Sequence, residues 1–245
     1  MNPILMESLE TMETMEQSSS SPKKETKPPK IILVFDTETS GLLPKTSEDT
    51  NMAKYPFILQ LSFVLYDMQC QRVIHKYNKY IRVPENVVIS QFITNLTGIT
   101  RQMCNSGVSI VSAIQDFYRA YKLCDAIVGH NISFDRQMLE IETIRNYGIL
   151  SQTIPMSAFM FNTTFQRLEN KQMYCTMAMG RNVCNLMVPS KTNPTISYKK
   201  NPKLEELYMH LFQEKMPNAH DAMFDTVACL RCFVMLKIGA DIGSG

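Results

Sequence analysis

The chain has 245 residues, of which 44% are hydrophobic, and its 25 basic and 23 acidic residues give a net charge of +2. This length and apolar content suffice for one well-packed core. The nearly balanced charge excludes a polycationic protein that coats duplex nucleic acid through many phosphate contacts.

Seven cysteines, an odd number with no framework spacing, favour reduced thiols and therefore a cytoplasmic or nuclear protein. No apolar run approaches the length of a membrane span. The segment 1–17 carries four glutamates where a signal peptide needs an apolar core. We therefore expect an intracellular protein without a signal peptide or transmembrane segment.

Residues 1–30 are polar and rich in Ser, Pro, Lys and Glu, which predicts a disordered N-terminal tail. Residues 31–239 are expected to form one domain, followed by a short C-terminal tail at 240–245. The apolar run 31–35 opens the domain and predicts a buried strand.

Asp36 and Glu38 directly follow this run. Alternate residues of a strand point to the same face, so both carboxylates project together. Two adjacent carboxylates repel each other unless a cation lies between them, and carboxylate oxygens suit Mg²⁺ or Mn²⁺ better than zinc. The competing interpretation is a pair of solvated acids at a strand end.

The middle of the chain predicts strands before helices. A polar loop spans 44–56, and strands at 57–66 and 73–82 would start the sheet in antiparallel order. A helix is predicted at 108–123, a strand at 126–128 and a helix at 134–147. Strands followed by alternating helix and strand indicate one mixed α/β domain.

A second polar motif, Gly129-His130-Asn131-Ile132-Ser133-Phe134-Asp135, follows the strand at 126–128. Asn131 or Ser133 would cap the next helix, and Asp135 in its first turn would suit the helix dipole. In the alternative interpretation, Asp135 is a further carboxylate of a metal or phosphate site, and Asn131 and Phe134 line the cleft.

Residues 151–198 show no clean period, although 176–186 favours a helix, and further helices are predicted at 203–215 and 221–237. A third motif opens the last of these, with His220 on the preceding loop and Asp225 in the first turns. A loop histidine can take a proton from water because its pKa lies near neutrality. A solvated histidine and an exposed helix acid are the alternatives. The pair Cys229-x-x-Cys232 lies in a helical pattern and favours packed thiols over zinc.

Taken together, the three motifs resemble those of the DEDDh exonucleases of the DnaQ-like family. That family carries Asp-x-Glu on a strand, an aspartate after His-Asn-x-x-Phe, and His-x-Ala-x-x-Asp at the last helix, and the resemblance covers about residues 31–238. A sister subclass has a tyrosine four residues before the last aspartate, where this chain has Asp221. The resemblance implies a ribonuclease-H-like fold with a central mixed β-sheet flanked by α-helices.

The resemblance also implies a function. Asp36, Glu38, Asp135 and Asp225 would hold two Mg²⁺ or Mn²⁺ ions about 4 Å apart, and His220 would be the general base. The activity would be 3′-to-5′ hydrolysis of DNA or RNA that releases nucleoside 5′-monophosphates. The terminal nucleotide of a 3′ end, in single-stranded form, would be gripped by a further set of residues: Thr39, Gly41, Leu42, Asn131 and Phe134.

Two other functions stay open at this point. The chain would be a proofreading or RNA-processing subunit that needs a polymerase or processing partner, or a non-catalytic nucleic-acid-binding relative. A homodimer is a further possibility that the sequence leaves open. The retention of all four acids argues against the non-catalytic alternative.

Overall fold

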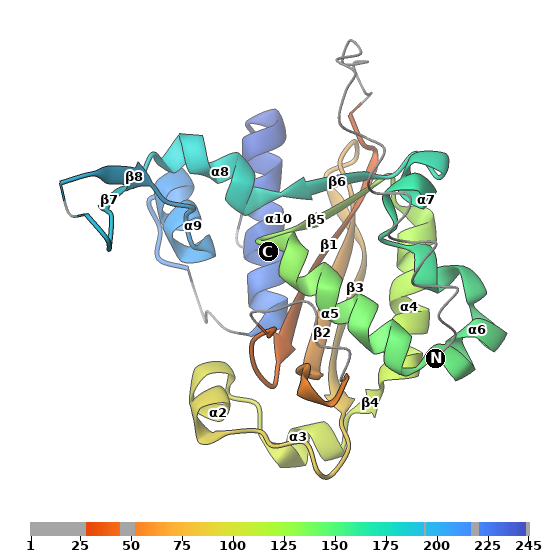
Figure 1. Ribbon diagram of the computed structural model, residues 1–245. Helices are drawn as coiled ribbons and strands as arrows, with labels where there is room; N and C mark the ends of the chain where they lie inside the picture. The colour runs from red at the N-terminus through yellow and green to blue at the C-terminus, as the bar shows by residue number, and fades with distance from the viewer. Residues whose placement is uncertain (1–27, 45–51, 194, 217–220, 244–245) are drawn as a thin grey trace.

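The computed structural model describes residues 28–44, 52–193, 195–216 and 221–243. Its centre is a six-stranded sheet in the order β4-β3-β2-β1-β5-β6 (Figure 1). The strands are β1 (Ile31–Thr39), β2 (Ile58–Asp67), β3 (Arg72–Arg82), β4 (Val108–Ser109), β5 (Ala126–Gly129) and β6 (Gln172–Cys175). The first three are antiparallel neighbours, whereas β5 runs parallel to β1 and β6 runs parallel to β5. This is the mixed sheet that the sequence predicts.

Helices cover both faces of the sheet. Helices α4 (Ile110–Leu123) and α5 (Ile132–Arg145) pack on one face, and α10 (Ala222–Ile238) packs on the other (Figure 1). The remaining elements are η1 (Met52–Lys54), α2 (Gln91–Thr97), α3 (Arg101–Asn105), α6 (Tyr147–Thr153), η2 (Pro155–Phe159), α7 (Thr163–Leu168), α8 (Thr176–Cys184), β7 (Met187–Pro189), β8 (Ser197–Lys199) and α9 (Leu204–Phe212).

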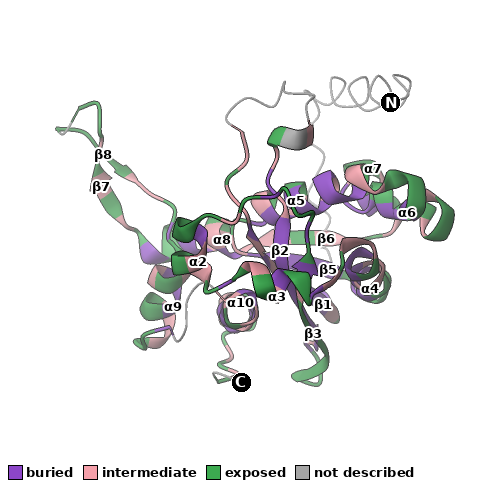
Figure 2. Cartoon of the chain, turned by 90° about the horizontal axis from the view of Figure 1, so that it is seen from below, coloured by how far each residue is buried: buried purple, intermediate pink, exposed green. Residues whose placement is uncertain are grey.

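The alternation of side chains along β1 divides the core in two. Leu33 and Phe35 join the cluster beneath α4 and α5, while Ile32 and Val34 join the cluster beneath α10. Because the strand is buried on both faces, it reads as a continuous apolar run. Figure 2 shows the resulting distribution, with buried residues in the sheet and on the inner sides of the helices.

Helix α10 is apolar on more than one side because it is covered on more than one side. Cys229 packs against the sheet, whereas Cys232 joins a cluster with Leu207 and Tyr208 of α9. Burial raises the pKa of both thiols. The expectation that this pair packs in the core is confirmed, and all seven cysteines, each within the described residues, are free.

The C-terminal end of the described chain folds back on this helix. Ala240 and Ile242 pack against the α10 cluster, and Asp241 forms an ion pair with the buried guanidinium of Arg231 at 2.6 Å. Arg231 also pairs with Glu214 at 2.7 Å and so links the end of α9 to α10. Within the described residues, no helix has the length and apolar character needed to cross a bilayer.

The longer elements agree with the predictions from sequence, and the short ones were not foreseen. The predicted strands correspond to β1, β2, β3 and β5, and the predicted helices correspond to α4, α5, α8, α9 and α10. The expected loop at 44–56 contains η1, and its residues 45–51 lie outside the described part, as do residues 1–27 of the expected tail.

A mutation in the aromatic core tests this packing. Phe117 of α4 is fully buried, and its ring centroid lies 5.0 Å from that of Phe35 and 5.6 Å from that of Phe63. Phe117→Ala should lower the free energy of unfolding by about 3–5 kcal/mol in urea denaturation. Phe92→Ala, at an exposed position of α2, should change it by less than about 0.5 kcal/mol. Equal effects at the two positions would contradict the packing described here.

Candidate active site

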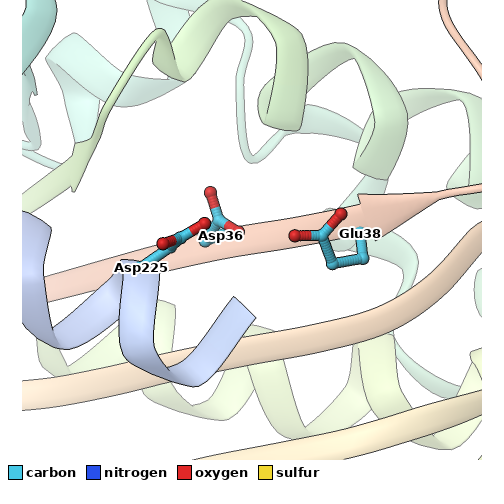
Figure 3. Close-up of side chains that lie close together, drawn as sticks. All are labelled: Asp36, Glu38 and Asp225. Carbon is cyan, nitrogen blue, oxygen red and sulfur yellow. The ribbon is translucent and has the colours of Figure 1, made fainter. Parts of the chain in front are cut away.

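Three carboxylates meet where β1 passes the first turn of α10. Asp36 and Glu38 continue the face of β1 that packs against α10, beyond the last apolar residue on that face. Asp225 approaches them from α10 (Figure 3). Each of the three residues offers one oxygen such that these atoms all lie within 4.8 Å of one another. The strand pattern and the predicted helix thus bring together acids 189 residues apart in sequence.

Burial and mutual repulsion make this cluster unfavourable as a set of free anions. Burial is the largest cause that raises the pKa of Asp36 well above its usual range, and the charges of Asp135 and Asp225 raise it further. Burial likewise raises the pKa of Glu38 to about 8, with Asp225 as the next cause. A cation between the carboxylates would reverse both effects, because it favours the ionised forms.

The donors fit a divalent cation. The cluster offers carboxylate oxygens, which are hard ligands, and close carboxylates of this kind suit Mg²⁺ or Mn²⁺. A buried carboxylate cluster is costly unless its charge is paired. The cluster therefore has the ligand atoms of a metal site, and a bound cation would neutralise its charge.

Asp135 lies next to this cluster but on the other side of β1. The backbone N–H and the hydroxyl of Thr37 both donate to its Oδ1, at 3.0 and 2.7 Å. Burial raises the pKa of Asp135 to about 7, and the two hydrogen bonds from Thr37 oppose that rise. Asp135 thus fixes α5 to the residue between Asp36 and Glu38, a role that its sequence position did not reveal.

The start of α5 departs from the expected cap. Asn131 occupies the N-cap position in the left-handed region, with φ 58°, and its side chain makes no capping hydrogen bond. Its Oδ1 instead accepts from the Ser133 hydroxyl at 3.3 Å, and Ser133 lies inside the helix. Phe134 is half-buried against the α4–α5 core. Only part of its ring surface is therefore available to a ligand.

Both ring nitrogens of His130 are hydrogen-bonded, which gives this residue a structural role. Its Nδ1 lies 2.9 Å from the Thr176 hydroxyl, and its Nε2 lies 3.1 Å from the Pro202 carbonyl. Burial lowers the pKa of His130 to about 4, so the ring is neutral at neutral pH. A neutral ring holds the end of β5 against the start of α8 and the segment before α9.

The residues predicted to contact substrate at the end of β1 differ in exposure, since Thr39 is buried, Gly41 is half-buried and Leu42 is exposed. The Thr39 hydroxyl donates to the Gly41 carbonyl at 2.7 Å, and the Phe57 N–H donates to the Ser40 hydroxyl at 2.9 Å. These bonds fix the turn, and Leu42 beyond it is 85% exposed. A large apolar side chain in this position is available for contact with a ligand.

Two residues that the sequence did not assign to the site support it. Asp221 caps α10, with its Oδ1 accepting from the Met223 N–H at 2.9 Å. Gln60, buried on β2 opposite Glu38, donates to Asn78 at 2.9 Å and to the Asp221 Oδ2 at 3.4 Å. A glutamine inside an apolar strand was the available signal, because a buried amide needs partners. His220 lies outside the described residues, so its predicted role stays a prediction.

The model of the Exonuclease family, RNase_T, matches residues 33–233. The DNA polymerase III PolC-type of Bacillus subtilis (strain 168) is 30% identical over 137 residues, which are 53% of this chain and 8% of the polymerase. The structure of E. coli exonuclease I in complex with a dT13 oligonucleotide aligns with a TM-score of 0.60 and 16% identity, over 85% of this chain and 41% of that chain.

A further similar structure is that of a 3′-exonuclease described for 3′-end specific recognition of the histone mRNA stem-loop. It aligns with a TM-score of 0.59 and 15% identity, over 88% of this chain and 85% of that one. The structural alignments confirm the predicted fold class. This chain spans less than half of E. coli exonuclease I and a small part of the polymerase.

The raised pKa values predict how stability depends on pH when metal is removed. The pKa of Glu38 rises from 4.5 to about 8 on folding, so the folded state binds the proton more tightly than the unfolded state. Stability should then fall as the pH rises from about 5 to about 8. In chelator, the melting temperature should decrease over that range, and saturating Mg²⁺ should flatten the decrease.

Two variants make this test specific. Glu38→Gln should lose part of the pH dependence in chelator, whereas Glu85→Gln, at an exposed position, should keep all of it. A melting temperature of the metal-free protein that stays constant or rises from about pH 5 to about pH 8 would contradict the assignment.

Proposed function

The chain belongs to the Exonuclease family, and on that premise we propose that it is a metal-dependent 3′-to-5′ exonuclease that hydrolyses DNA or RNA. The reaction is attack of water on the last phosphodiester. The bond between phosphorus and the 3′ oxygen breaks, and a nucleoside 5′-monophosphate leaves. The observation that carries the proposal is the half-buried cluster of Asp36, Glu38 and Asp225.

In this proposal the carboxylates are the ligands of the metal ions. Asp36, Glu38 and Asp225 would bind divalent cations, and Asp135 would contribute through Oδ2, directly or through water, because its Oδ1 accepts from Thr37. Two Mg²⁺ or Mn²⁺ ions, when bound, supply positive charge to the phosphodiester and lower the pKa of water. Asp135 also keeps Asp36 and Glu38 aligned by holding the backbone between them.

The remaining roles are proposed for His220 and for the predicted substrate-binding residues. His220 would take the proton from the attacking water, since imidazole has the right pKa for that transfer. Leu42 would contact the terminal base, and the turn at Thr39 and Gly41, with Asn131 and the exposed part of Phe134, would enclose the nucleotide. Apolar contacts to a base are tolerant of its identity, so we expect weak sequence preference.

A second candidate is the same activity exercised beside a polymerase. The observation that favours it is the 30% identity to a protein named as a DNA polymerase III. In that case the isolated chain would have little activity on 3′ ends, and addition of the polymerase would restore it.

End-labelled oligonucleotides test the reaction. With Mg²⁺, 3′-labelled single strands should release the label first as a mononucleotide, and 5′-labelled strands should shorten stepwise. Asp36→Asn should reduce the rate to that of the enzyme in chelator, because the variant loses a metal ligand. Asp116→Asn, which changes a surface acid paired with Arg119, should keep the wild-type rate. Early release of a 5′ label, or an Asp36→Asn enzyme that remains active, would contradict the proposal.

His220→Ala tests the proposed base separately from the metal ligands. General-base catalysis contributes about 10²- to 10⁴-fold, so the rate constant of a single turnover should fall by about that factor. Hydroxide can replace the base, so the deficit should narrow as the pH is raised. His210→Ala, at an exposed position of α9, should have no effect. A deficit that is constant with pH would assign His220 to another role.

A further inference from the structure

Residues 181–203 form a strongly basic segment, which we call the basic arm. It contains five basic residues and no acidic one, whereas the rest of the chain has 20 basic and 23 acidic residues. The arm includes the β7–β8 hairpin, and its basic residues are Arg181, Lys191, Lys199, Lys200 and Lys203. The arm is thus one of the basic segments of a nearly neutral protein, and β3, which has four basic residues and no acidic one, is another.

The hairpin stands away from the body of the molecule (Figures 1 and 2). Its apolar side chains are uncovered: Met187 is 54% exposed, Ile196 57% and Tyr198 48%. A two-stranded hairpin alone is marginally stable in water, and this one is anchored only at its base. The Arg181 guanidinium donates to the Lys199 carbonyl at 3.1 Å, and the Lys200 N–H donates to the Leu186 carbonyl at 2.9 Å.

The arm emerges at the edge of the sheet that carries the carboxylates. Strands β1, β5 and β6 are parallel, so their carboxyl ends meet at one edge, and β6 leads through α8 into the arm. The far end of the arm returns to the same place, because the Pro202 carbonyl accepts from His130, the neighbour of Asn131. The C-terminal end of the arm therefore lies beside Asn131, a residue of the proposed substrate site.

We propose that the basic arm binds the sugar–phosphate backbone of the nucleic acid, on the 5′ side of the nucleotide being removed. This inference rests on the proposed function. The carboxylate cluster repels a polyanion that extends beyond the metal site, and a basic segment beside it supplies the opposing attraction. Lysine and arginine side chains are typical phosphate ligands, and the tip adds the polar side chains of Ser190, Thr192 and Asn193.

The shape of the arm is compatible with both single-stranded and duplex nucleic acid. An exposed aromatic ring such as Tyr198 can stack on an unpaired base, and a two-stranded ribbon fits the major groove of a duplex. In both cases the lysines of the arm other than Lys200, which pairs with Glu206 of α9, contact backbone phosphates. Binding should then be independent of sequence and sensitive to salt.

The test removes two charges from the arm. Lys191→Gln/Lys199→Gln is compared with Arg72→Gln/Lys76→Gln, a pair of exposed positions on β3, which β2 separates from the strand that carries Asp36 and Glu38. Binding of labelled oligonucleotides of about 30 nucleotides, single-stranded and duplex, is measured by fluorescence anisotropy over a salt series, in the inactive Asp36→Asn background. Hydrolysis of a trinucleotide is measured in the active background.

For the arm variant we expect binding of the single strand to weaken about tenfold at physiological salt, with the slope of log K against log salt reduced by about 1.4. Hydrolysis of the trinucleotide should remain at the wild-type rate, because its two phosphodiesters lie at the carboxylates and not along the β7–β8 hairpin. The β3 variant should match wild type in both measurements. A larger effect on the duplex than on the single strand would identify groove binding.

Unchanged affinity and salt slope in the arm variant would overturn the inference, and the uncovered apolar side chains would then point to a protein partner. Equal losses of affinity in the arm and β3 variants would overturn it as well. The weaker binding would then follow from the lower total charge of the protein and not from the position of the lysines. If wild-type protein fails to hydrolyse the trinucleotide, the proposed function fails, while the binding measurements still decide the inference.

Discussion

The structure depends on placing several carboxylates in a largely buried environment at the end of one strand. Burial and repulsion raise the pKa of Asp36 and Glu38, so without a cation the fold holds these groups against their electrostatic preference. Packing supplies the opposing free energy, because β1 is sandwiched between α10 and the α4–α5 pair. The apolar layers on both faces thus make an energetically unfavourable site possible.

Two sets of hydrogen bonds connect the packed helices to the strands beside the carboxylates. Asp135 accepts hydrogen bonds from the backbone N–H and the hydroxyl of Thr37, so α5 is coupled to the backbone between the two acids of β1. On the opposite face, Asp221 caps α10 and accepts from Gln60, which couples the helix that carries Asp225 to β2. Preorganisation of this kind matters for phosphoryl transfer, where catalysis consists mainly of positioning and electrostatics.

The sequence was most informative where one physical rule decided the outcome. Alternation along a strand placed Asp36 and Glu38 on the same face, and a long apolar period identified α10 and hence the surroundings of Asp225. It was least informative at 83–107 and, apart from the helix at 176–186, at 151–198, where the elements are short and are set by tertiary contacts more than by periodicity. The Asp135–Thr37 bonds join residues 98 apart in sequence, a separation beyond any local pattern.

The order of the elements along the chain has a consequence for synthesis. The carboxylate cluster joins β1, the first strand of the described chain, to α10, its last helix. Chains emerge from the ribosome with their N-terminal part first, so Asp36 and Glu38 emerge long before Asp225 is made. A nascent chain therefore holds an incomplete site until α10 has emerged and docked, and the same topology that builds the site delays its completion until the other described elements have been made.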